Sequence, residues 1–370
     1  MTRKQEVFVF CVLLSIAGYA QEEQQTEAAQ QAWKYDGMLG INATATGMVN
    51  WNGGGNDNAS ALAYAKFHLL YHKDGVAWET NFDTDFGLTW IDQEDDQWKK
   101  SSDKIKFVTK FGWEFQKGWY LTALGGFQSQ YTEGREYKKG KYDPVISNWL
   151  TPSRTDLSLG IDWKTSVNGC DFSVYMSPVA GLITTAYVSD AQNKLYTEEY
   201  KNAMKAAGQT ISEDYVDFRR EMQLKYGTYK IIQDINGKPD VDWRSHRAEF
   251  GFSFKGTIAY KYKDLTLGTT LGLYTPYREK GYNLKEAFEK AYPGTKYEGY
   301  YIYSNLNRHF GLFDVDWDFN ISYRFLKVMN VTFSSHLKYF TGTLIKDKDG
   351  VEKERVQFKS ILGLGVGYSF

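Results

Sequence analysis

The sequence predicts a transmembrane antiparallel β-barrel of about twelve strands, with short turns at one end and long loops at the other. Three observations predict this class: strands in which apolar and polar residues alternate, connections that are alternately long and short, and an apolar final strand that ends on an aromatic residue. Aromatic residues make up 17% of the chain although the mean hydropathy is −0.51. A large soluble β-sandwich is the alternative, but it has no reason to sort its loops by length.

The first 20 residues read as a secretory signal peptide. Arg3 and Lys4 precede an apolar run from Val7 to Gly18 that is too short for a membrane helix, and small residues lie before Gln21. A hydrophobic N-terminal core helix is the alternative. Residues 21–35 begin Gln/Glu-rich and are expected to form a periplasmic leader, which leaves 36–370 as the barrel.

Period-two alternation predicts each strand in turn. The expected strands are 38–48, 59–71, 76–90, 104–116, 119–131, 154–163, 171–188 with a break possible at Pro178, 243–260, 265–274, 309–325, 331–344 and 355–370. Connections are long after odd-numbered strands and short after even-numbered ones, as a barrel with two periplasmic termini requires. Within the long loops, acidic residues early and basic residues late predict helices at 197–207 and 212–224, and a third is expected at 284–292.

The last strand places Val356, Phe358 and Leu362 on one face and glycines on the other. Together with Tyr368 and the terminal Phe370, it resembles the closing signal that assembly machinery reads in outer-membrane barrels. The resemblance implies a Gram-negative outer membrane, with its lipid, its lipopolysaccharide and the barrel-assembly machinery as partners and other envelope proteins as further candidates. A net charge of −1 gives no reason to expect nucleic acid, and no cofactor is expected.

The first half of the chain resembles a known family. Between residues 33 and 188, the resemblance rests on Asn50-Trp51-Asn52-Gly53-Gly54, Ser102-Asp103-Lys104-Ile105, Phe111-Gly112-Trp113, Trp119-Tyr120, Phe127-Gln128-Ser129-Gln130-Tyr131, Leu159-Gly160-Ile161-Asp162-Trp163 and Tyr175-Met176-Ser177-Pro178. This part is similar to an outer-membrane barrel family of unknown function from Bacteroidota-type bacteria, with an Asn-Trp-x-x-Gly-Gly motif. The resemblance implies the fold and the outer-membrane location, and it implies no catalytic residues.

Charged residues fall on the inward face of several strands. Acidic strands lie beside basic ones, and because same-face residues on adjacent strands are about 5 Å apart, they are expected to form a ladder of ion pairs. The alternative is an ion path or a cation site, although the spaced Asp trio lacks the Gly and distal Glu of a calcium loop, so no metal is expected. The expected charge ladder of the lumen is Glu79, Asp83, Asp85, Lys106, Lys110, Arg247, Glu249, Asp314, Asp316, Asp318, His336 and Lys338.

The leading functional hypothesis is a pore for small polar solutes or ions, with the charge ladder setting its selectivity. The alternative is a sealed barrel that serves as a scaffold or subunit of an envelope complex, with residues 189–242 as its contact surface. A barrel enzyme acting on lipid is the least favoured class, because Ser335 and His336, like Ser245 and His246, are sequence neighbours that should point to opposite faces.

Overall fold

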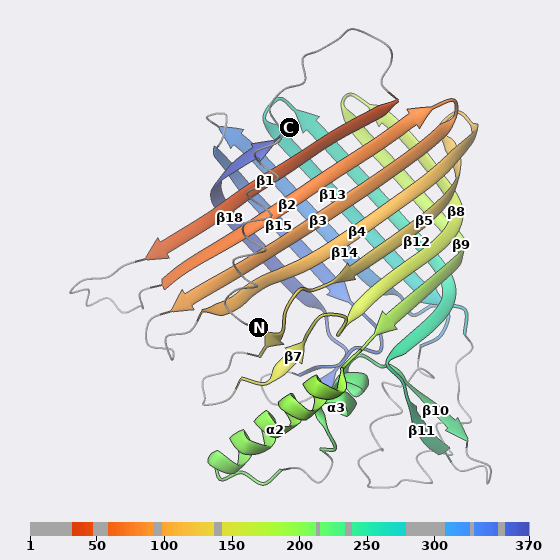
Figure 1. Cartoon of the computed structure of the whole chain (residues 1–370). Helices are drawn as coiled ribbons and strands as arrows, with labels where there is room; N and C mark the ends of the chain where they lie inside the picture. The colour runs from red at the N-terminus through yellow and green to blue at the C-terminus, as the bar shows by residue number, and fades with distance from the viewer. Residues whose placement is uncertain are drawn as a thin grey trace. The chain divides into compact units, whose positions relative to one another are not determined.

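The alternating segments close into one barrel. The computed structural model describes residues 32–46, 58–91, 98–136, 143–211, 215–233, 239–278, 308–325, 329–346 and 352–369. Twelve strands form the closed sheet in the order β1-β18-β15-β14-β13-β12-β9-β8-β5-β4-β3-β2, and each neighbouring pair is antiparallel (Figure 1). Their bounds are β1 Trp33–Thr46, β2 Asn58–Lys73, β3 Val76–Ile91, β4 Lys99–Gln116, β5 Trp119–Ser129, β8 Ser153–Val167, β9 Cys170–Thr185, β12 His246–Tyr262, β13 Leu265–Pro276, β14 Asp314–Phe325, β15 Met329–Tyr339 and β18 Gln357–Ser369. All twelve expected strands are confirmed.

The alternation of side chains gives the barrel an apolar outer face and a polar inner one. On β8, Leu157 and Leu159 are 59% and 57% exposed, whereas Ser158 and Asp162 on the other face are buried. On β18, Phe358 is 65% exposed. A sheet that must bury its polar face in its own interior and show its apolar face outward is stable where the surroundings are apolar.

Tight turns join the strands at one end of the barrel. Asn168 and Gly169, between β8 and β9, have φ values of 50° and 77°, the two positive angles of a primed hairpin turn, which the Asn-Gly pair adopts readily. Asp74 and Gly75 repeat these angles between β2 and β3. The start of β1 lies at the same end, because Trp33 pairs with Tyr71 beside the β2–β3 turn. The expected sorting of short turns and long loops is therefore confirmed.

Several strand boundaries at the loop end differ from the expectation, and three of them are set by a turn or a separate hairpin. The strand expected from 309 begins at Asp314, because a turn that includes Gly311 at φ 98° comes first. The strand expected to reach 344 ends at Tyr339, where a turn closes through the Thr343 N–H bond to the Phe340 carbonyl. The strand expected from 243 begins at His246, since Trp243 pairs within a separate hairpin.

The expected break at Pro178 is a pair of β-bulges rather than the end of a strand. Two residues of β9, Ser177 and Pro178, lie opposite Gly160 of β8, and on the other side of β9 the register with β12 also shifts. Proline has no N–H to give to a ladder, so bulges are where a strand tolerates it. The Ser177 hydroxyl donates to the Leu159 carbonyl at 2.7 Å and accepts from the Val179 N–H at 3.2 Å.

Small elements gather at the loop end of the barrel (Figure 1). They are β6 Gly134–Arg135, β7 Val145–Ser147, α2 Asp190–Ala206, α3 Phe218–Lys225, β10 Tyr229–Gln233, β11 Pro239–Trp243, β16 Ile345–Lys346 and β17 Glu352–Lys353. We call α2, α3, β6, β7, β10 and β11 the loop-end cap. Ser189 and Asp217 cap the N-termini of α2 and α3, so these helices begin at 190 and 218 rather than at 197 and 212.

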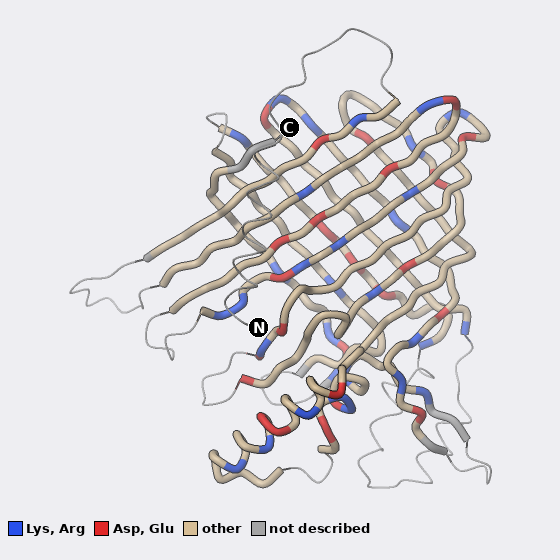
Figure 2. The backbone as a smooth tube through the Cα atoms, in the orientation of Figure 1, with Lys and Arg blue, Asp and Glu red and all other residues tan. Residues whose placement is uncertain are grey.

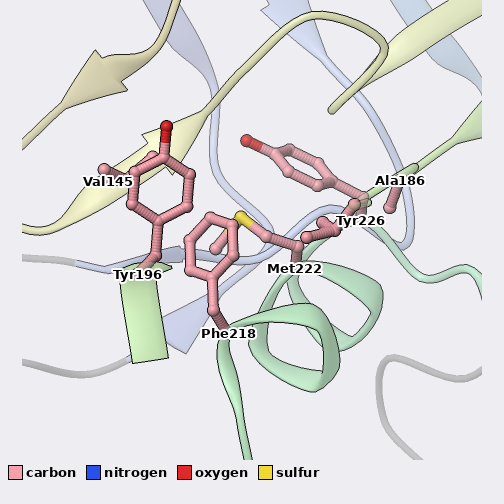
Figure 3. Close-up of a cluster of buried hydrophobic side chains, with 7 residues drawn as sticks. Val145, Ala186, Tyr196, Phe218, Met222 and Tyr226 are labelled. Atoms are coloured by element: carbon pink, nitrogen blue, oxygen red, sulfur yellow. The ribbon is translucent and has the colours of Figure 1, made fainter. Parts of the chain in front are cut away.

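The loop-end cap has an apolar core of its own. The Tyr196 ring of α2 meets the Phe218 ring of α3 edge-on at 4.8 Å between centroids, and Met222 and Tyr226 pack beside them (Figure 3). Burial and the Glu133 carboxylate that accepts the Tyr196 hydroxyl at 2.6 Å both raise the pKa of Tyr196. Its hydroxyl therefore remains a neutral donor that ties α2 to the segment before β6.

Some expectations fall outside the described residues. The signal peptide, most of the leader and the helix at 284–292 lie there, as does the terminal Phe370. Of the leader, the structure describes the end, where β1 already begins at Trp33. Among the described residues, no helix has the length and apolar character that a membrane span needs.

Candidate functional site

Charged residues recur along the barrel strands (Figure 2). Many of their side chains meet in the interior of the barrel, the lumen. At the loop end, Arg308 is 1% exposed and lies between two buried carboxylates. Its Nε donates to Glu249 Oε1 at 2.8 Å and its Nη1 donates to Asp314 Oδ1 at 2.9 Å. Arg154 Nη2 reaches the other oxygen of Asp314 at 2.6 Å. We call these residues, with Arg247 beside Glu249, the loop-end layer.

The loop-end layer also holds the cap on the barrel. Arg247 Nη1 donates to the Gly227 carbonyl, just after α3, at 2.6 Å. The N–H of Leu344, which follows β15, bonds to the carbonyl of Lys225 in α3 at 2.8 Å. Burial opposes the charge of Arg308, but the carboxylates of Asp314 and Glu249 outweigh it and raise the pKa of the guanidinium. The layer is thus a network of paired charges with little exposure to solvent.

A second group, the middle layer, crosses the lumen. Lys106 of β4 pairs with Asp318 of β14 at 2.5 Å. Five strands separate β4 from β14 in either direction around the barrel, so this ion pair joins opposite walls. Lys104, also on β4, reaches Asp83 at 2.7 Å and Asp85 at 3.5 Å. A twelve-stranded barrel is intermediate between side-chain-filled eight-stranded barrels and open porins, and here long side chains bridge it.

A third group, the turn-end layer, lies nearer the tight turns. Lys110 pairs with Asp162 at 2.8 Å, and the Asp162 side chain is fully buried. Lys164 reaches Glu79 at 3.3 Å, and His68 lies 3.7 Å from the same carboxylate. Each of these contacts links strands that are not neighbours or positions that are offset along the strands, so the layer ties separate parts of the wall together.

The expected ladder is present as residues but differs in its pairing. Lys106 lies directly opposite Asp83 in the β3–β4 register, yet its ammonium pairs with Asp318 across the lumen. Lys110 lies opposite Glu79 but pairs with Asp162. A lysine side chain is long enough to leave its cross-strand neighbour, and in a closed barrel the inward direction leads to other strands. The prediction of direct cross-strand pairs was therefore wrong for these lysines.

Asp316, Asp318 and His336 bring potential metal-ligand atoms within 4.8 Å of one another. His336 Nε2 lies 2.5 Å from Asp316, and Lys106 lies 2.5 Å from Asp318. An ammonium already sits where a cation would bind, so the arrangement fits an ion-pair network better than a metal site. Lys338 lies opposite Asp316 in the β14–β15 register, next to this cluster.

The serine–histidine expectation needs a correction at one site. Ser245 Oγ lies 3.4 Å from Nδ1 of His246, because Ser245 precedes β12 and is free of its alternation. The contact is long and exposed, and among the described residues no carboxylate contacts His246 to orient it. A nucleophile, a base and an orienting group are therefore not assembled there.

The seam between the first and last strands is short. β1 and β18 pair over five positions, from Met38↔Ser369 to Asn42↔Gly365, and Leu39 lies opposite Tyr368. Tyr368 of the expected closing signal thus takes part in the strand that closes the barrel. The Asn42 side chain lies over Gly363 and Gly365, where any Cβ would collide with it.

The sequence reasoning missed several residues of these layers. Asp162 and Arg154 lie in an expected strand but are absent from the expected charge ladder. Arg308 comes just before the strand expected from 309 and is absent from the ladder too. Asp162 and Arg154 lie at alternate positions of β8 whose side chains point into the barrel, and this alternation was the available signal. Arg308 lies outside every strand, and its partner Glu249 is 59 residues away, so no local pattern marks it.

Comparison with known proteins leaves the activity open. Residues 43–134 match the family model described as "Protein of unknown function (DUF3078)". This overlaps the region in which the sequence resembles a family of unknown function, while the bacterial source and the motif stay predictions. No curated protein sequence matches the chain.

Many solved barrels resemble the structure at low similarity. They include the NanC porin, at 8% identity over 90% of this chain and 98% of that one, with a TM-score of 0.31. The translocator domain of the autotransporter NalP from Neisseria meningitidis has 8% identity, 99% and 96% coverage and a TM-score of 0.32. An outer membrane channel from Pseudomonas putida F1 has 9% identity, 94% and 99% coverage and a TM-score of 0.34. At these TM-scores the likeness carries no argument about fold or function.

Proposed function

We propose that this chain is an outer-membrane β-barrel whose lumen is closed at rest and whose loop-end cap is a contact surface for other envelope components. Both termini and the tight turns face the periplasm, and the cap faces outward. The exposed apolar side chains of the outer wall, such as Leu157 and Phe358, match lipid, and charged side chains point inward. Barrel closure leaves no long unpaired sheet edge in the hydrocarbon.

One observation carries the closed state: the Lys106–Asp318 ion pair joins opposite walls of the barrel. The loop-end layer adds a second barrier, since Arg308 and Asp314 are 1% and 3% exposed. Water and small ions need a continuous polar path that side chains do not cross. Two successive layers of bonded side chains interrupt such a path, which favours the scaffold over the pore, and no enzymatic activity is proposed.

The test is single-channel recording of the refolded protein in a planar lipid bilayer. We expect wild-type protein that is folded, by its heat-modifiable mobility on gels, to give no discrete conductance steps. Stable steps from the folded wild type would overturn the closed state and favour the alternative, a pore for small polar solutes or ions.

A double substitution removes one side chain from each barrier. Lys106→Ser with Arg154→Ser is expected to conduct and to prefer cations, because Asp314, Asp316 and Asp318 keep their charge. The control is Lys263→Ser with Arg244→Ser, which removes the same charges from a turn and from an exposed position and should stay silent. A folded but silent Lys106/Arg154 double variant would show that these two side chains are not what closes the lumen, because Arg308 still pairs with Asp314 and Glu249 in it.

A further inference from the structure

A cavity lies in the lumen, between the loop-end layer and the middle layer. Its lining includes Lys106, Arg154, Asp156, Lys255, Asp314 and Asp316. Two inward glycines make room for it. Gly272 is paired with Lys255 of β12 on one side and with Asp316 of β14 on the other. The Asp156 carboxylate lies over Gly126, so close that a Cβ on Gly126 would collide with it. A pocket with a few convergent polar groups is the usual form of a small-molecule site.

Most charges at this cavity are already paired. Arg154 pairs with Asp314, and Lys106 pairs with Asp318. Asp316 is bonded to His336. These groups can therefore hold the walls in place but have little capacity left to neutralise a ligand.

Lys255 and Asp156 are different. Among the residues that the structure describes, none forms an ion pair or side-chain hydrogen bond with either group, although both line the cavity. Lys255 on β12 is flanked in the register by Tyr175 and Gly272, neither of which carries a negative charge. The strongest opposite charge acting on Lys255 is that of Asp156, which forms no ion pair with it. A zwitterion placed between the two groups would neutralise both, so it would bind favourably.

The remaining lining suits a partly apolar ligand. Val108, Leu124 and Tyr274 contribute apolar surface to the same cavity, and Phe340 is held in place by the Arg154 guanidinium, 3.7 Å from its ring centroid. Ser158 and Ser253 add small hydroxyl groups. The cavity thus offers an apolar wall together with one cation and one anion that form no ion pair with any residue the structure describes.

We propose that this cavity binds a small zwitterion of the amino-acid type, with its carboxylate on Lys255, its ammonium on Asp156 and an apolar side chain against Val108 and Leu124. The assignment goes beyond the closed-barrel function and does not depend on conduction. It implies that the lumen is a receptor site as well as a seal. Charge-assisted hydrogen bonds to both charged groups of the ligand would give the site its preference for zwitterions over singly charged molecules.

The test is isothermal titration of the refolded full chain in detergent with L-leucine as the probe. We expect one saturable site, and at least about tenfold weaker binding of 4-methylpentanoate and of leucinamide, each of which lacks one of the two required charges. Absence of L-leucine binding to the folded wild type would overturn the proposal. If either singly charged probe bound as tightly as L-leucine, the zwitterion assignment would be overturned.

Matched variants locate the site. Lys255→Gln and Asp156→Asn are each expected to weaken L-leucine binding about tenfold or more, and Lys255→Arg, which keeps the charge, should retain most of it. Lys66→Gln is the control, because Lys66 is an inward lysine of β2 outside the cavity, and its substitution should leave binding unchanged. Unaltered binding in a folded Lys255→Gln variant would contradict the assignment.

Discussion

Replacing Arg308 with methionine is expected to lower the free energy of unfolding by about 3–5 kcal/mol, the usual cost of removing one partner of a buried ion pair. The side chain is 1% exposed and bonds to both Glu249 and Asp314. Without it, two buried carboxylates face each other across the loop-end layer, and the Thr341 carbonyl loses a donor. Methionine fills much of the volume, so the loss should come mainly from charge.

Urea unfolding in detergent, followed by tryptophan fluorescence, measures this change. The control is Arg244→Met, since Arg244 is 44% exposed and pairs with the partly exposed Asp242 at 2.6 Å. Removing such a pair should cost at most about 1 kcal/mol. Similar losses in both variants would mean that the buried network contributes no more than a surface ion pair.

The strands were predictable because a single local rule specifies them. An inner face that must be polar and an outer face that must be apolar impose period two on each strand, and β8 shows it from Leu157 to Trp163. Turn residues such as Asn168 and Gly169 marked the short connections by their own backbone preferences. Boundaries at the loop end failed where turns, at Gly311 and near Gly342, interrupt a pattern that continues in the sequence.

The lumen was predictable only as a set of charges. The alternation of side chains along each strand places those of Asp318 and Lys106 in the lumen. Which charged groups meet there depends on how the barrel closes and on the tilt of its strands. A partner on the opposite wall is 212 positions away and leaves no trace in local spacing. Arg308 shows the same limit more strongly, because its position is set by a turn rather than by a strand.

The two roles proposed for the lumen share a physical basis. Paired charges such as Lys106–Asp318 are rigid and satisfied, which suits a seal. Lys255 and Asp156 form no ion pair with any described residue, which suits recognition. A barrel that needed only to be filled could have used apolar side chains at less cost. The coexistence of satisfied and unsatisfied charges at one level of the barrel is what distinguishes a binding site from packing.

The glycines beside the β9 bulges are expected to be indispensable for folding. A Cβ at Gly160 would lie 2.1 Å from the Met176 carbonyl oxygen, and one at Gly251 would lie 2.1 Å from the Thr275 carbonyl oxygen. Both obstacles are backbone, which cannot rotate away as a side chain can. Relief therefore requires the strands to separate and their hydrogen bonds to lengthen, so Gly160→Ala and Gly251→Ala should each destabilise the barrel by about 3 kcal/mol or more.

The matched control for these two substitutions is Gly268→Ala on β13, where an added Cβ would meet no atom within 4 Å. That change should be neutral or slightly stabilising, because alanine restricts the unfolded chain more than glycine does. The measurement is the fraction of refolded protein that runs as the heat-modifiable band, with its urea midpoint. If Gly160→Ala refolds as well as Gly268→Ala, the bulge is not the close backbone contact that the structure shows. If only Gly160→Ala and Gly251→Ala fail, the paired bulges around Pro178 are a structural requirement of the barrel wall.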